Sequence, residues 1–163
     1  MRRWLPGAVA LVLLAAGGLI AGAAGEDSQC PRLRDAFTSM PVKMVSLESG
    51  QKKIALRVKL ADTSERPPAG FQCATPQEIQ RNLILFDFGE EILTQFHMQN
   101  VPAPLDIAFI KADGRIFAIL RMEPSPTALY GPTRPFRYAL EARAGFFESQ
   151  GIRQDSARLL MDR

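Results

Sequence analysis

The chain has 163 residues, too few for two ordinary domains once a leader is removed, and 47% of them are hydrophobic, enough for one core. Charged residues make up 23%, which excludes a wholly disordered chain. Setting aside Arg2 and Arg3 leaves 18 of the 20 basic residues against 17 acidic ones, a balance too close to neutral to attract a polyanion, so we expect no nucleic-acid partner.

Residues 1–24 have the layout of a secretory signal peptide. Met1-Arg2-Arg3 is positively charged, the stretch from Leu5 to Ile20 is apolar, and Ala21-Gly22-Ala23-Ala24 supplies small residues. The apolar stretch is short for a membrane span, and its glycines weaken it as a permanent helix. We therefore predict cleavage near Ala24 to Glu26, an exported protein, periplasmic or secreted, and no permanent membrane span after cleavage.

The chain has two cysteines, Cys30 and Cys73. In an oxidising compartment two cysteines favour one disulfide, which would tie the N-terminal end of the mature chain to a loop. Two cysteines and one histidine fall short of the four ligands that structural zinc prefers, so we expect no metal site. No phosphate loop or dinucleotide fingerprint occurs in the sequence, and we expect no cofactor.

Strand patterns begin after a short N-terminal arm, residues 25–41, in which the apolar residues have no firm period. From Val42 a strand is expected, and after Ser49-Gly50-Gln51 the chain alternates cleanly between apolar and polar residues over 52–62. A period of two is typical of a half-buried strand, so these two runs predict a hairpin. Residues 42–163 are interpreted as a single β-domain.

A short helix is predicted after Thr75, because Pro76 suits a first helical position and Glu78 completes a capping box. Elsewhere the apolar and aromatic runs predict strands at 83–88, 92–99, 105–111, 115–122, 136–143 and 156–161, with one or two helical turns at 144–150. Many short strands with little helix predict an all-β fold, a sandwich or a barrel.

Several short motifs in a fixed order resemble the domain-of-unknown-function 192 family, over about residues 43–161. They are Gly70-Phe71-Gln72, Leu83-Ile84-Leu85-Phe86, Phe96-His97-Met98-Gln99-Asn100, Pro104-Leu105-Asp106-Ile107-Ala108-Phe109, Asp113-Gly114-Arg115 and Tyr138-Ala139-Leu140-Glu141. The resemblance implies a compact β-sandwich of jelly-roll type with minor helices, and it implies no established activity. His97 stands where the family usually has Trp.

Our first functional hypothesis is a non-catalytic binding or accessory module of the cell envelope. Its site would lie where the only histidine, His97, meets Asn100, Asp106 and the proline-rich loop 123–135, with Tyr130 available for stacking. The partner would be a small molecule, a glycan or an envelope protein. Asp106 also has a structural interpretation, because it could bond Asn100 and close the bend that contains Pro102 and Pro104.

The alternative hypothesis is a small hydrolase that acts on glycans or envelope material through the carboxylates of Asp106 and Glu141. Glycoside hydrolysis needs two carboxyl groups about 5–9.5 Å apart in one open cleft. Glu141 has a simpler interpretation as the partner of an arginine on a neighbouring strand, and the candidates are Arg57, Arg137 and Arg143. We favour the binding module, and we expect that the protein is not an enzyme.

Overall fold

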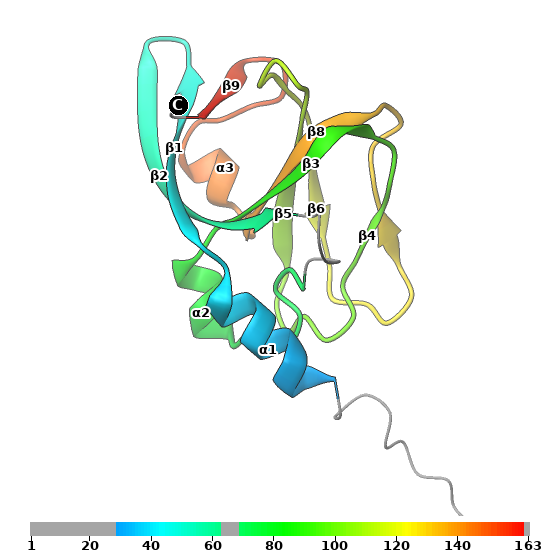
Figure 1. Ribbon diagram of the computed structural model, residues 1–163. Helices are drawn as coiled ribbons and strands as arrows, with labels where there is room; N and C mark the ends of the chain where they lie inside the picture. The colour runs from blue at the N-terminus through cyan, green and yellow to red at the C-terminus, as the bar shows by residue number, and fades with distance from the viewer. Residues whose placement is uncertain (1–28, 63–68, 162–163) are drawn as a thin grey trace, which may run out of the picture.

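The computed structural model describes residues 29–62 and 69–161, so the predicted signal peptide lies outside the described residues (Figure 1). The helices are α1 (Cys30–Ser39), α2 (Pro76–Arg81) and α3 (Phe146–Ser149). The strands are β1 (Val42–Ser49), β2 (Lys52–Asp62), β3 (Ile84–Ile92), β4 (Phe96–His97), β5 (Leu105–Ile110), β6 (Ile116–Met122), β7 (Leu129–Tyr130), β8 (Phe136–Arg143) and β9 (Ala157–Met161). The prediction of an all-β fold with minor helices is confirmed.

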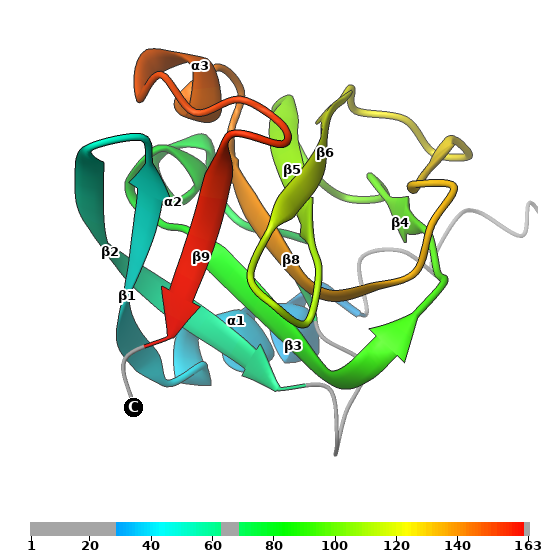
Figure 2. The ribbon, with the colours of Figure 1, turned by 90° about the horizontal axis from the view of Figure 1, so that it is seen from above.

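Seven strands form one sheet in the order β6-β5-β8-β3-β2-β1-β9. The sheet curls until its two edge strands meet: Arg115 bridges Arg158, and the Leu159 amide donates to the Gly114 carbonyl at 2.7 Å. Figure 2 shows β9 running next to the β5–β6 hairpin. One curled sheet therefore supplies both layers of the predicted sandwich, and its edges cover each other.

The sheet has a hydrophobic layer on each face. One face, called here the α1 face, is covered by α1, α2 and the loops between strands; its buried side chains include Phe37, Phe71, Ile79, Phe86, Phe109 and Phe136. The opposite α3 face is the inside of the curl; its buried side chains include Leu47, Val58, Leu85, Leu140, Phe147 and Leu159. The central strands β3, β5 and β8 are therefore buried on both sides, which explains their nearly continuous apolar sequences.

Several local predictions are confirmed in detail. The alternating run predicted at 52–62 is strand β2, and α2 begins with the predicted capping box: the Glu78 amide donates to Thr75 Oγ1 at 3.2 Å, and the Thr75 amide donates to Glu78 Oε2 at 2.7 Å. Gly114 turns the β5–β6 hairpin with a φ of +88°, and a Cβ there would lie 2.2 Å from the Leu159 carbonyl oxygen. Only glycine fits that turn and that contact.

Two expectations were wrong in their local structure. The arm contains a ten-residue helix, α1, because Phe37 packs against Phe71 with 5.8 Å between ring centroids. The strand predicted at 92–99 is mostly absent: β3 continues past Gly89 to Ile92, and only two residues of the run form β4, which pairs with β7. Within the described ranges, none of the helices has the length and apolar composition of a membrane span.

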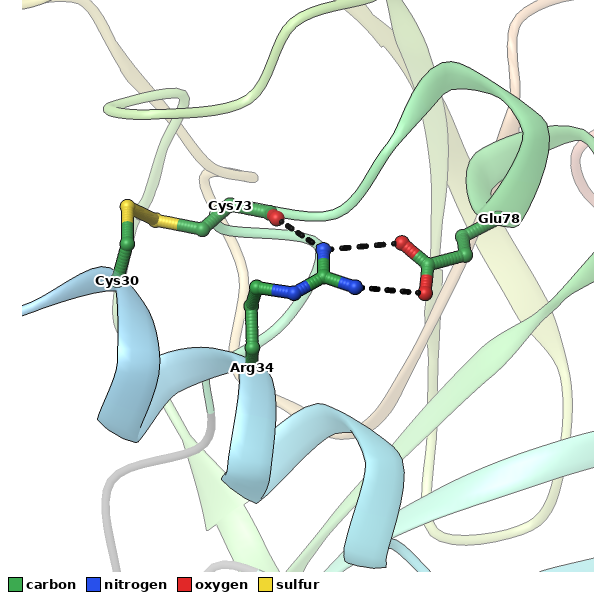
Figure 3. The surroundings of a disulfide bond; sticks show 4 residues. All are labelled: Cys30, Arg34, Cys73 and Glu78. Carbon is green, nitrogen blue, oxygen red and sulfur yellow. Dashed lines mark hydrogen bonds and ion pairs between the residues drawn. A yellow bond between two sulfur atoms is a disulfide. The ribbon is translucent and has the colours of Figure 1, made fainter.

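The predicted disulfide between Cys30 and Cys73 is present and joins α1 to the turn before α2 (Figure 3). Arg34, one helical turn after Cys30, reinforces this connection. Its guanidinium donates to the Cys73 carbonyl at 2.8 Å and contacts both carboxylate oxygens of Glu78 at 3.2 Å. The paired geometry holds α1, the turn and α2 in one arrangement. The turn at 69–73 is thus held in place by contacts with α1, which is not part of the sheet.

Candidate functional site

A pocket of about 250 Å³ opens on the α1 face, between the turn at 69–73, strand β3, strand β4 and strand β8. Its polar groups come from Gln72, Thr94, Gln95, His97 and Glu141. The rest of its lining is mainly aromatic and small apolar residues. We call it the Glu141 pocket, because Glu141 is the buried carboxyl residue in its lining.

Glu141 lies on β8 in the middle of the sheet, opposite Ile84 of β3 and Ile107 of β5. Only 4% of the residue is exposed, and its Oε2 has no hydrogen-bond partner among the described residues. Burial raises the pKa of the Glu141 carboxyl to about 8, so near neutral pH the group is largely protonated. The predicted cross-strand pairing with an arginine is wrong, because the flanking positions on both neighbouring strands are isoleucines.

The turn at 69–73 covers the Glu141 carboxyl closely. Gly70 has a φ of +55°, and a Cβ at this position would lie 3.2 Å from Glu141 Oε2 and 3.6 Å from the Phe86 ring. Glycine therefore permits both the backbone conformation and the close approach. The far end of the turn is fixed at Cys73, whose amide donates to the Asn100 carbonyl at 2.7 Å.

Four phenylalanines line the pocket, and three of them, from β3 and β4, form what we call its aromatic wall. Phe86 and Phe88 lie two residues apart on β3 and so share a face, and Phe96 from β4 meets both edge-on, with centroid distances of 5.3 Å and 6.4 Å. Next to this wall, His97 is exposed and lines the pocket; its Nδ1 accepts a 3.3 Å hydrogen bond from the Gln99 amide. The wall places aromatic rings in the pocket lining beside one buried carboxyl group.

The lining contains two ionisable side chains, His97 and Glu141, and no lysine or arginine among the described residues. In the same part of the chain no group of three or more His, Cys, Asp or Glu side chains is arranged to hold a metal ion. The pocket is therefore suited to a small organic ligand that contacts aromatic rings and one carboxyl group.

Asp106 lies on the other side of the sheet. It pairs with Ala142, a residue of the α3 face, whereas the neighbouring Glu141 points to the α1 face, since successive strand residues alternate. Its carboxylate forms an ion pair with Arg121 and accepts a 2.7 Å hydrogen bond from the Gly145 amide. Asp106 and Glu141 thus do not share a cleft, and the predicted carboxylate pair for hydrolysis is contradicted by the geometry.

Two further expectations about this region need correction. Asn100 is exposed in a left-handed turn with a φ of 55°, and the carboxylate of Asp106 is bonded to Arg121 and Gly145, so the predicted bond between Asn100 and Asp106 is wrong. Tyr130 does not line the Glu141 pocket; its hydroxyl donates to the Glu123 carbonyl at 3.0 Å and closes the proline-rich loop. Of the four predicted ligand-facing residues, His97 is the one that lines this pocket.

Sequence reasoning missed most of the polar rim. Gln72 stands in the quoted motif Gly70-Phe71-Gln72, and it reaches the pocket because the next residue, Cys73, is fixed by the disulfide. Thr94 and Gln95 lie in the connection between β3 and β4 that was predicted as strand. The motif Gly70-Phe71-Gln72, which ends directly before Cys73, was the one available signal for this rim.

Fold and site together define a small β-domain with a curled sheet and a single-carboxyl aromatic pocket. The sequence profile of DUF192, described as Uncharacterized ACR, matches residues 45–158, and the chain belongs to this family. No curated protein matches the chain.

The solved structures that share the fold include the following two proteins. One is described as "a putative transcription regulator" from Sinorhizobium meliloti 1021; it has 29% identity and a TM-score of 0.67, covering 76% of this chain and 95% of that one. The other is a protein of unknown function from Novosphingobium aromaticivorans DSM 12444, with 21% identity and a TM-score of 0.62, covering 75% of this chain and 86% of that one. The likeness to the second extends to the fold alone.

Proposed function

We propose that this protein is a non-catalytic binding module and that the Glu141 pocket is its ligand site. The observation that carries the proposal is the buried carboxyl group of Glu141, a residue that lines an open pocket and whose Oε2 has no partner within the described residues. A buried polar atom without a hydrogen bond costs about 1–3 kcal/mol. A ligand that supplies the missing hydrogen bond would recover that free energy, and this recovery would favour its binding.

The pocket favours binding over catalysis. Hydrolysis by carboxyl groups needs a second acid or base opposite the first, and the only other ionisable side chain among the described lining residues is His97. Asp106, the predicted second carboxylate, is on the α3 face. A lone neutral acid between aromatic rings is suited to hold a ligand group in place.

The proposal predicts ligand-induced stabilisation that depends on Glu141. A thermal-shift screen of small metabolites on residues 25–163 should find compounds that raise the Tm of the parent by several degrees, because a ligand that binds only the folded state stabilises it. The same compounds should raise the Tm of Glu141→Gln much less, while Glu90→Gln, an exposed change on β3, should behave like the parent. Hits that stabilise parent and Glu141→Gln equally would place the ligand elsewhere.

The same proposal places the module outside the cytoplasm, as an accessory protein of the cell envelope. The support is the N-terminal pattern of residues 1–24 together with the Cys30–Cys73 disulfide, which is compatible with an oxidising compartment. Intact-mass measurement of the protein from its native host should give a chain that begins near Ala24 to Glu26. Recovery of a chain that still starts at Met1 would contradict export by cleavage.

One solved structure with the same fold is described as "a putative transcription regulator", a role that would imply a nucleic-acid partner. The charge of this chain supports a different partner, because 18 basic and 17 acidic residues outside Arg2 and Arg3 leave little attraction for phosphates. The pocket lining, with a carboxyl group and no lysine or arginine among the described residues, supports the same conclusion. We therefore propose a small molecule as the partner.

A further inference from the structure

We infer that the ligand of the Glu141 pocket is an organic cation with N–H donors, a primary or secondary ammonium group on an apolar body. The inference rests on the proposed function and names the class of ligand. Glu141 lines the pocket, and its Oε2 has no donor from any described residue. An ammonium group supplies N–H donors and positive charge at the same point, and charge-assisted hydrogen bonds are about twice as strong as neutral ones.

The aromatic wall favours a cation independently of the carboxyl group. Phe86, Phe88 and Phe96 line the pocket, and the faces of such rings attract ammonium groups within about 6 Å of the centroid. The fold already uses this contact elsewhere: the ammonium nitrogen of Lys59 lies 4.6 Å from the Phe37 ring centroid. An anionic ligand would find neither lysine nor arginine among the described lining residues.

A neutral ligand with a carbonyl group is the competing class, because a protonated Glu141 could donate to it. The two classes differ in the protonation state that they need. A cation binds the ionised carboxylate, so its affinity must rise as the pH approaches the pKa of Glu141, which burial raises to about 8. A neutral acceptor needs the protonated acid, so its affinity must be constant below that pH and fall above it.

Charged side chains on the elements around Glu141 have contacts of their own within the described chain. On β3, Asp87 contacts Arg137 of β8 at 3.4 Å; on β5, Asp106 is paired with Arg121 on the α3 face. On α2, Glu78 is paired with Arg34 of α1; at the end of β8, Arg143 donates to the Ala144 carbonyl. His97 of β4 is the remaining titratable group that lines the pocket, and the experiment must include a His97→Gln control.

The test is a titration of residues 25–163 with three probes of matched size, followed by amide NMR. The probes are n-butylammonium, butan-1-ol and butyrate, at about pH 6 and about pH 8; like the lysine side chain, with a pKa of about 10.4, an alkylammonium stays charged across this range. We expect n-butylammonium to shift the signals of the 69–73 turn and to bind at least tenfold more tightly at pH 8 than at pH 6. The rise in affinity from pH 6 to pH 8 should persist in His97→Gln, whatever that change does to the affinity itself.

Substitution isolates the carboxyl group. Glu141→Gln keeps the shape of the side chain and removes its charge, and it should weaken n-butylammonium binding at pH 8 at least tenfold and abolish the pH dependence. Glu90→Gln, on the exposed part of β3, should leave both unchanged. Melting curves of the variants establish that each is folded before it is titrated.

The outcomes separate the two proposals. If butan-1-ol or butyrate shifts the same signals as strongly as n-butylammonium, the inference of a cation is overturned and the proposed binding function stands. If n-butylammonium binds equally well in parent and Glu141→Gln, the inference is also overturned. If none of the probes shifts the 69–73 turn, the cation class is refuted, and the metabolite screen decides separately whether the binding function fails with it.

Discussion

Replacing Glu141 by Gln should remove a large part of the pH dependence of this protein's stability. In the folded parent the carboxyl pKa is raised from 4.5 to about 8 by burial, whereas the unfolded chain releases the proton near 4.5. Between those values the folded state binds more protons, so the free energy of unfolding falls as the pH rises through this window. The loss approaches about 5 kcal/mol for the full shift, which is a large fraction of the stability of a small domain.

Urea unfolding at about pH 5 and about pH 8 measures this effect directly. The parent should lose several kcal/mol between the two conditions, and Glu141→Gln should lose much less, because an amide does not titrate in this range. Any fixed cost of burying the amide is the same at both pH values and cancels in the comparison. Glu90→Gln should follow the parent. Equal pH dependence of parent and Glu141→Gln would refute the buried neutral acid.

Removing the disulfide should cost the second large amount of stability. Cys30 and Cys73 are separated by 43 positions, and closing a loop of that length corresponds to about 4 kcal/mol in the chain-entropy model. The double variant Cys30→Ser with Cys73→Ser should therefore unfold at a much lower urea concentration. The reduced parent should match it, since both lack the same covalent bond.

The disulfide also has a local effect on the Glu141 pocket, because it holds the end of the turn that covers the carboxyl group. In the serine variant the covalent bond between α1 and the turn is absent. The turn is then held by the hydrogen bond from Arg34 to the carbonyl of residue 73 and by the ion pair between Arg34 and Glu78. Hydrogen exchange of the amides at 69–73 should become faster relative to that of the β5–β8 strands, since local opening becomes easier. Uniform acceleration over the whole sheet would instead indicate a purely global loss of stability.

Much of the local structure followed from the sequence. The period of two over 52–62 and the capping box at Thr75 each depend on residues that are neighbours along the chain, and each has the predicted form. The disulfide was also predictable, because the predicted export favours a disulfide and two cysteines allow one pairing.

The position of Glu141 shows where such reasoning ends. Alternation along β8 predicts that the side chains of Glu141 and Ala139 lie on the same face of the sheet. It does not predict which segments cover that face. An exposed face would make Glu141 a surface partner for arginine, as we predicted. The structure instead covers it with a turn some 70 positions earlier in the sequence, at Gly70, and with aromatic residues of β3 and β4.

Long-range pairing decided the remaining differences. The parallel pairing of β2 with β3 and the meeting of β6 with β9 join segments that carry no local signal for each other. The antiparallel pairing of β5 with β8 likewise places Asp106 and Glu141, one pairing step apart, on opposite sides of the sheet. The sequence by itself determined the strands, the caps and the disulfide, because these depend on local geometry and on the number of cysteines. Only the tertiary structure decided which carboxyl group is ion-paired and which is buried without a partner, because desolvation depends on the segments that pack over each group.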